Sequence, residues 1–267
     1  MSKSYDLSTS SKWANLADGE HTVKIKAKGT GFGTSSFSNS VTVTKGSAMP
    51  VKGDLITIES KQYRVLKVNN SVAEVLAMYD AIANQRFAVN NTYAGGTIDV
   101  YLNETFYNGL SATIKTAIVE KTFKQDSWTT NGGSSAIANY TGVYQTANNY
   151  ILSLMSTAYG ISISRKCYAL SVQDIINYLG VTTSMNSANT TLTSENIWKM
   201  FWNQTTSIDN KRIWLRSAVQ STSDTAFSAS GTYGFLGRNN TELEGNYRSA
   251  FQIDLSKITW SSVGGGN

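Results

Sequence analysis

The stretch that decides the fold is RIWLRSAVQSTSDTAFSASGTYGFLGRNNTELEGNYRSAFQIDLS, residues 212–256. It opens and closes on apolar, strand-like pieces, IWLRS and RSAFQIDLS. Between them, Ser, Thr, Gly and Asn residues carry Phe227, Tyr233, Phe235 and Leu236. Two interpretations are open. The segment is either a β-meander whose apolar residues face inward, or a set of loops that display aromatic side chains to a partner, as antibody binding loops do.

The length and composition are those of a globular protein: the chain has 267 residues, including six Trp, 14 Tyr and nine Phe. That is enough for one large domain, or for one domain and a smaller module. The formal net charge is +5, but residues 213–256 hold three arginines against four acidic residues. The loop-rich stretch therefore lacks the excess of positive charge needed to bind the phosphate backbone of a nucleic acid. We expect no nucleic-acid partner.

The chain has one cysteine, Cys167, and one histidine, His21. A single cysteine excludes an internal disulfide, which fits folding in a reducing cytosol. A single histidine, at the start of an alternating strand, disfavours zinc sites and Ser–His–Asp or Cys–His catalysis. We expect no catalytic residue, no metal and no cofactor. Residues 1–10 are polar and predict no signal peptide. No apolar run approaches roughly 18 residues, so we expect no membrane insertion.

The N-terminal part predicts a small β module. HTVKIKAKG (21–29) and SVTVTK (40–45) alternate apolar and polar residues, which indicates a hairpin. The sequence around them resembles the last two strands of a fibronectin type III or immunoglobulin-like module. We therefore expect a partial immunoglobulin-like module over residues 1–46. A linker over residues 47–52, with the only proline of the chain, Pro50, follows it.

From residue 53 the pattern mixes strands and helices. Residues 54–68 and 71–79 alternate and predict two strands. Helical spacing predicts helices over residues 97–110 and 111–123, and two more over 169–180 and 191–204, with Ser111 and Thr193 as N-caps. Strands, helices and long irregular segments in this order favour an α+β domain.

No motif assembles a catalytic site. The acidic residues Asp80, Asp99, Glu104, Asp126, Asp174 and Asp254 are scattered singly. A carbohydrate-active enzyme would need two of them brought about 5–10 Å apart by the fold. Arg216 is a candidate for a buried or half-buried ion pair, and Asp254 in the returning strand is a possible partner.

Several pieces together resemble a known family. They include residues 93–128 and 167–184, and the frame of WLRS and RSAFQIDL at the two ends of the 212–256 stretch. They are similar to C-type-lectin-fold domains of bacteriophage and prophage proteins, of the formylglycine-generating-enzyme-like subclass. That family includes the variable proteins of diversity-generating retroelements. Ser249 stands where the family often has proline.

The resemblance covers residues 53–258 and implies an α+β C-type-lectin-like ligand-binding domain there, with residues 259–267 as a C-terminal tail. In retroelement targets the C-terminal surface is varied through adenine-directed mutagenesis of asparagine-type codons. The residues that such codons permit form the candidate ligand-binding surface. They are Val219, Ser221, Thr222, Ser223, Asp224, Phe227, Tyr233, Phe235, Leu236, Arg238, Asn239 and Asn240. The calcium-binding motifs of lectins are absent, so we expect no calcium in this face.

The function implied is non-enzymatic recognition by a phage tail adhesin or receptor-binding protein, made in the bacterial cytoplasm and carried on the virion. The expected partner is a host-surface protein or glycan. A homo-oligomer, or attachment to other virion proteins through the N-terminal module, is also expected. Two alternatives stay open: a structural virion component with the stretch buried in an oligomer interface, and a carbohydrate-active enzyme.

Overall fold

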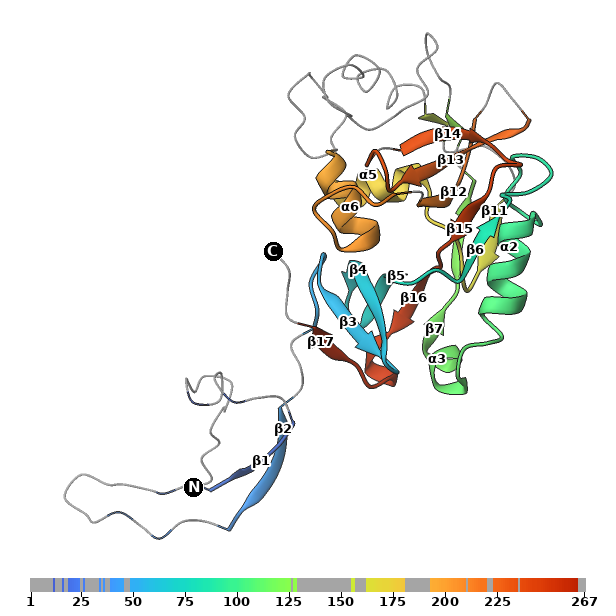
Figure 1. Cartoon of the computed structure of the whole chain (residues 1–267). Coiled ribbons are helices and arrows are strands. Elements are labelled where there is room, and N and C mark those ends of the chain that lie inside the picture. The colour runs from blue at the N-terminus through green and yellow to red at the C-terminus, as the bar shows by residue number, and fades with distance from the viewer. Residues whose placement is uncertain are drawn as a thin grey trace. The chain divides into compact units, whose positions relative to one another are not determined.

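The computed structural model describes residues 12, 16, 19–24, 26, 34, 36, 39–45, 49–125, 127–128, 155–156, 162–180, 193–209, 211–219, 223–234 and 236–263. The chain divides into two compact units, unit 1 (Met1–Met49) and unit 2 (Pro50–Asn267), which are drawn in Figure 1. The division falls inside residues 47–52, the stretch expected to be a linker.

Unit 1 contains an antiparallel hairpin of β1 (Gly19–Val23) and β2 (Val41–Lys45). The register pairs Gly19 with Lys45 and Val23 with Val41. The hairpin predicted from the alternating pattern is confirmed, but its first strand ends at Val23, before the exposed Lys24 and Lys26. An immunoglobulin-like identity for this unit stays a prediction.

A six-stranded sheet forms one part of unit 2. Its strands are β3 (Leu55–Ile58), β4 (Lys61–Asn69), β5 (Val72–Ala77), β7 (Ile118–Val119), β16 (Ala250–Asp254) and β17 (Ser261–Val263). They lie in the order β17-β3-β4-β5-β16-β7, and all neighbours are antiparallel. Residues 259–267 were expected to be a tail. That expectation is wrong for Ser261–Val263, which pairs with β3 at the sheet edge.

A second, seven-stranded sheet contains most of the 212–256 stretch. Its strands are β6 (Ile82–Gln85), β9 (Ser127–Trp128), β10 (Met155–Ser156), β12 (Arg212–Val219), β13 (Thr225–Ser230), β14 (Leu236–Asn240) and β15 (Gly245–Tyr247). The pairs are antiparallel except that β12 runs parallel to β9 and β15. A separate two-stranded ribbon joins β8 (Lys121–Lys124) to β11 (Ser162–Arg165).

The helices in the described part of the chain are short. They are α2 (Thr97–Val100), which continues as the π-helix η2 (Tyr101–Phe106), then α3 (Ala112–Ala117), α5 (Val172–Leu179), α6 (Ser194–Trp202) and the 3-10 helix η4 (Leu255–Lys257). The two predicted N-caps are confirmed: Ser111 accepts from the Ile114 amide and Thr193 from the Asn196 amide. Among the described residues, no helix is long and apolar enough to cross a membrane.

The predicted α+β, C-type-lectin-like fold class is wrong. Unit 2 is mostly β-sheet arranged as several antiparallel sheets, and no specific C-type-lectin fold is shown. Two segments account for the difference. The helix predicted over residues 111–123 ends at Ala117, because residues 118–124 pair as β7 and β8. Much of the stretch expected to form display loops pairs as β13, β14 and β15.

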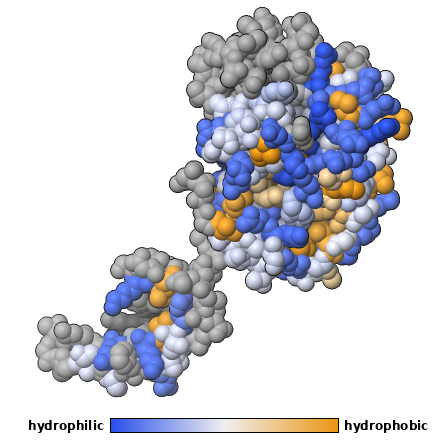
Figure 2. Space-filling view, in the orientation of Figure 1, coloured by the Kyte–Doolittle hydropathy of each residue, from blue (hydrophilic) through white to orange (hydrophobic). Residues whose placement is uncertain are grey.

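A single cluster of buried side chains runs through unit 2 from β3–β5 and β16 to β12–β14, α5 and α6. Trp214 is fully buried, stacks edge-on against Phe87 at 5.5 Å between centroids, and donates to the Gln85 carbonyl at 3.1 Å. Phe227 and Leu236 belong to the same cluster. Of the two interpretations of the opening stretch, the described residues therefore follow the inward-facing meander. The face of unit 2 in Figure 2 carries its hydrophobic residues in small groups among hydrophilic ones.

This placement predicts different effects for two aromatic residues of the same segment. Phe227→Ala removes a side chain that is 1% exposed, and should lower the free energy of unfolding by about 3–5 kcal/mol. Tyr233→Ala removes a side chain that is 46% exposed, and should change it by about 0.5 kcal/mol or less. Urea denaturation of the full chain measures both values. Equal losses for the two variants would contradict the meander.

Candidate functional site

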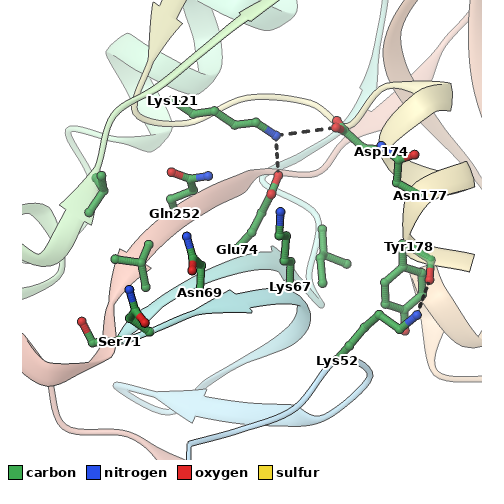
Figure 3. Close-up of a pocket in the computed structure, with 14 residues that line it drawn as sticks. Lys52, Lys67, Asn69, Ser71, Glu74, Lys121, Asp174, Asn177, Tyr178 and Gln252 are labelled. Carbon is green, nitrogen blue, oxygen red and sulfur yellow. Dashed lines mark hydrogen bonds and ion pairs between the residues drawn. The ribbon is translucent and has the colours of Figure 1, made fainter. Parts of the chain in front are cut away.

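A polar groove of about 810 Å³ lies between the six-stranded sheet and α5 (Figure 3). Its volume is within the range of small-ligand sites. Nine of the 14 residues that line it carry an amide, ammonium or carboxylate group. The lining residues are Lys52, Leu66, Lys67, Asn69, Asn70, Ser71, Val72, Glu74, Val119, Lys121, Asp174, Asn177, Tyr178 and Gln252.

The floor of the groove is a row of side chains across four strands of the sheet. Lys67 on β4 pairs with Glu74 on β5, and Glu74 pairs with Gln252 on β16. Gln252 pairs in turn with Val119 on β7. Residues directly opposite on neighbouring strands present their side chains to the same face. The register therefore places Lys67, Glu74 and Gln252 side by side on the face of the sheet that is turned toward α5.

The wall of the groove is one face of α5. Asp174, Asn177 and Tyr178 are spaced three and four residues apart, which places them side by side on a helix. The opposite face buries Val172, Ile175 and Ile176. The sequence sets both ends of this helix, and so the position of its polar face. Ser171 and Asp174 form a capping box at the start, and Gly180 ends the helix at a φ of 70°.

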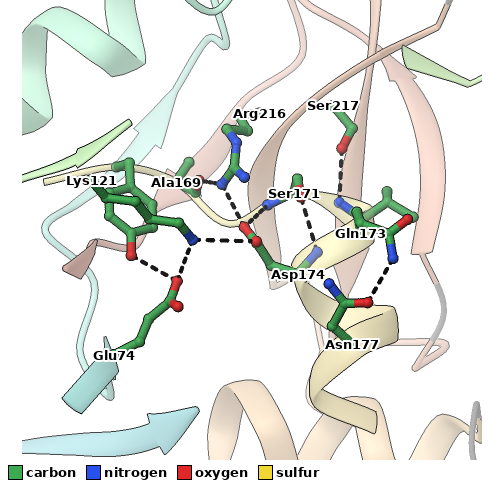
Figure 4. Close-up of polar contacts among 11 residues, drawn as sticks. Glu74, Lys121, Ala169, Ser171, Gln173, Asp174, Asn177, Arg216 and Ser217 are labelled. Atoms are coloured by element: carbon green, nitrogen blue, oxygen red, sulfur yellow. Dashed lines mark hydrogen bonds and ion pairs between the residues drawn. The ribbon is translucent and has the colours of Figure 1, made fainter. Parts of the chain in front are cut away.

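An ion network joins the floor to the wall (Figure 4). The Lys121 ammonium lies 2.6 Å from Glu74 Oε1 and 3.6 Å from Asp174 Oδ1. The Tyr168 hydroxyl donates to Glu74 Oε1 at 2.7 Å. Arg216 donates to Asp174 Oδ2 at 2.6 Å and to the Ala169 carbonyl at 2.7 Å. Both carboxylates therefore have cationic partners and fixed positions.

Arg216 forms the buried ion pair that the sequence suggested, but the suggested partner is wrong. Its guanidinium reaches Asp174 on α5, and also lies 4.3 Å from the centroid of the Phe123 ring. Asp254 pairs instead with Lys257 at 3.3 Å and accepts from Ser256 at 2.7 Å. Arg216 is only 4% exposed, and a buried guanidinium needs an anionic partner beside it. Asp174 on α5 is that partner.

The charges around Asp174 decide its protonation. Burial by itself would raise the pKa of Asp174, but the charges of Arg216 and Lys121 outweigh burial. Hydrogen bonds from Arg216 and Ser171 add to their effect, and the pKa falls to about 2. Asp174 is therefore a carboxylate across the neutral range, able to accept hydrogen bonds but not to donate a proton.

We also looked for a metal centre and for a reactive cysteine in the described part of the chain. There, no group of three or more His, Cys, Asp and Glu side chains is placed to hold a metal ion. Cys167 is buried, and burial raises the pKa of its thiol to about 12, which keeps it in the unreactive thiol form.

Only some residues of the predicted variable surface are exposed, and none of those that the structure describes lines the groove. Val219, Phe227 and Leu236 are in the core, so their predicted display is wrong. Pairing of β13 with β14 places Phe227 and Leu236 there, and Val219 lies on β12 opposite Trp128 of β9. The exposed members are Ser223, Asp224, Tyr233 and Asn240, while Arg238 and Asn239 are half-buried. Ser221, Thr222 and Phe235 lie outside the described residues.

Most groove residues escaped the sequence analysis. Asp174 was noted only as one of several scattered acids, and Lys67, Glu74 and Gln252 were not singled out. A signal was present, because each of the three is a polar residue next to apolar residues of its strand. That signal marks a solvent-facing side of a sheet, and it cannot say which strands are neighbours.

The depressed pKa of Asp174 makes stability depend on pH. A carboxylate whose pKa is lower folded than unfolded stabilises the fold above the unfolded pKa of about 4, and this contribution disappears as pH falls toward 2. The shift corresponds to about 2 kcal/mol of unfolding free energy. Urea titrations at pH 7, 4 and 2 measure it. We expect Asp174→Asn to be less stable at pH 7, because Arg216 loses its partner, and to lose less further stability on acidification.

Comparing Asp174→Asn with wild type controls for other carboxyl groups that titrate over the same pH range. The pKa of Asp254 is also lowered to about 2, by hydrogen bonds from Ser256 and Ser71, but Asp254 is present in both proteins. Parallel pH profiles for wild type and Asp174→Asn would contradict the assignment.

The chain matches one model of a known protein family. A model described as a domain of unknown function (DUF6273) matches residues 72–255. The matched span includes Glu74, Lys121, Asp174 and Gln252, but it begins after Lys52 and Lys67. No curated protein and no solved structure matches the chain significantly. Because the model covers more than half of the sequence, the chain belongs to the DUF6273 family of domains of unknown function.

Proposed function

We propose that unit 2 recognises a saccharide in the polar groove and does not transform it. The observation that carries the proposal is the arrangement of donors and acceptors across the groove. Lys67, Glu74 and Gln252 project from the sheet, and Asp174 and Asn177 project from the helix that faces them (Figure 3).

This mixture suits hydroxyl groups. A hydroxyl both donates and accepts, and so can bridge a carboxylate acceptor to an ammonium donor, or use the oxygen and nitrogen of one amide. Asn69, Asn70 and Asn177 supply further amides, and Tyr178 supplies an aromatic side chain at the edge of the groove. The charged groups are held in place by the network around Lys121 and need little reorganisation when a ligand enters.

The carboxylate pair also favours a second candidate, a glycoside hydrolase. Glu74 and Asp174 both lie within 4 Å of the Lys121 ammonium, so the fold brings two carboxyl groups close together. Such enzymes need one carboxyl that holds its proton until it is transferred. Asp174 does not fit that role with a pKa of about 2, and Glu74 already accepts hydrogen bonds from Lys121 and Tyr168. Recognition is the better match.

The biological setting that we propose is a bacteriophage or prophage particle on which the protein acts as an adhesin. Its support is the resemblance of residues 53–258 to phage and prophage sequences, not the fold. A neighbouring reverse-transcriptase gene with a near-copy of the 3′ coding segment, differing at adenines, would test whether a retroelement varies the exposed Ser223, Asp224, Tyr233 and Asn240. The absence of such genes around it would remove the retroelement from the proposal.

Saccharide recognition predicts loss of binding when groove amides are removed. Asn69→Ala and Gln252→Ala should each weaken binding to an oligosaccharide found on a glycan array by about fivefold, since one hydrogen bond contributes about 1 kcal/mol. Calorimetric titration of the full chain measures the affinity. Gln204→Ala is the matched control, because Gln204 is exposed and does not line the groove.

Thermal unfolding shows whether each variant is folded. Melting temperatures near that of wild type, with binding weakened about fivefold in Asn69→Ala and Gln252→Ala but unchanged in Gln204→Ala, would support the proposal. An array on which no saccharide binds, or groove variants that bind as tightly as wild type, would refute it.

A further inference from the structure

We propose that the saccharide recognised by the groove carries carboxylate groups, as uronic and sialic acids do. This inference rests on the proposed function and specifies its ligand. Its basis is the balance of charge inside the groove, which depends on which charged groups already have partners.

The two acids of the groove are neutralised within the fold. Lys121 lies against both Glu74 and Asp174, and Arg216 lies 2.6 Å from Asp174. Two carboxylates and two cations therefore form a neutral set (Figure 4). These are also the only acidic residues that line the groove, as far as the described residues show. They can accept hydrogen bonds from hydroxyl groups, but they leave no net negative charge to repel a weak anion.

Two further cations remain, Lys52 and Lys67. In the described part of the chain, neither takes part in an ion pair. The Lys52 ammonium donates to the Tyr178 carbonyl at 3.0 Å and lies 5.7 Å from the centroid of the Tyr178 ring. Both contacts hold its position and neither cancels its charge. Lys67 stands directly across from Glu74 on the floor, and points into the opening in Figure 3.

The groove therefore has an excess of two positive charges, at its rim and on its floor, beside neutral amides. Lysine offers a compact point charge with three donors, and a carboxylate is its ordinary partner. A saccharide with carboxylates on its rings would place an anion at the lysines and hydroxyls at Asn69, Asn177 and Gln252. Neutral saccharides would leave the two ammonium groups without an anionic partner.

Phosphate fits the groove less well. Phosphate sites commonly use the free backbone amides at a helix N-terminus. At the start of α5 these positions are occupied, because Ser171 and Asp174 cap each other at 3.0 Å in both directions.

Matched ligands test the inference directly. Trigalacturonic acid and its methyl ester present the same ring hydroxyls, and only the acid is charged. In about 20 mM salt we expect the full chain to bind the acid about tenfold more tightly than the ester, as two partly exposed ion pairs would produce. In about 500 mM NaCl most of this preference should disappear, because screening then acts within about 5 Å.

Variants locate the effect. Lys52→Gln and Lys67→Gln should each weaken binding of the acid about three- to fivefold and weaken binding of the ester less, so that the preference for the acid over the ester falls. Lys211→Gln is the matched control, because Lys211 is exposed and lies outside the groove. Melting temperatures near the wild-type value would show that the variants are folded.

The outcomes separate this inference from the proposed function. Equal affinity for the acid and the ester would overturn the carboxylate assignment while saccharide recognition stands. Displacement of trigalacturonic acid by inorganic phosphate at lower concentrations than by acetate would assign the lysines to phosphate and also overturn it. Failure of the acid, the ester and every neutral saccharide on the array to bind would overturn both.

Discussion

The ion pair between Arg216 and Asp174 is the interaction on which the site depends. Arg216 belongs to β12 of the seven-stranded sheet, and Asp174 to the first turn of α5. Lys121 and Glu74 extend the network to β8 and to β5 of the six-stranded sheet. A buried guanidinium without a partner is strongly destabilising, so the fold must hold α5 where its carboxylate meets Arg216. The same requirement places the polar face of α5 over the sheet and creates the groove.

This arrangement also separates two kinds of charge in one groove. Glu74, Asp174 and Lys121 are structural charges, whose partners lie within the protein. Lys52 and Lys67 lie at the same groove without carboxylate partners among the described residues, so their charges are available to a ligand. A count of charges along the sequence cannot make this distinction, because the net charge of a site depends on which groups are already neutralised.

The segment between β12 and β16 shows how composition can mislead. Its Ser, Gly, Asn and aromatic residues match the composition of display loops, and they equally match strands that are buried on both faces. β13, TAFSAS, has four consecutive buried residues, with small Ala and Ser side chains beside Phe227. A strand covered on both sides lacks the alternation by which strands are usually recognised. Small residues in such a strand reflect space limits in a packed interior, and the sequence offers no local sign of that covering.

By itself, the sequence determined the features that depend on neighbours within a few residues. The cap at Ser111, the start of α6 at Thr193, the end of α5 at Gly180 and the alternation in β1 all follow from local hydrogen bonding and period. It also indicated that Arg216 would be buried and paired. Only the tertiary structure decided the partner of Arg216, the fold class and the groove. Glu74 meets Lys121 across 47 residues, and Arg216 meets Asp174 across 42. Strand register and helix docking set such pairings. Both depend on the packing of the whole core, which a pattern of a few neighbouring residues does not specify.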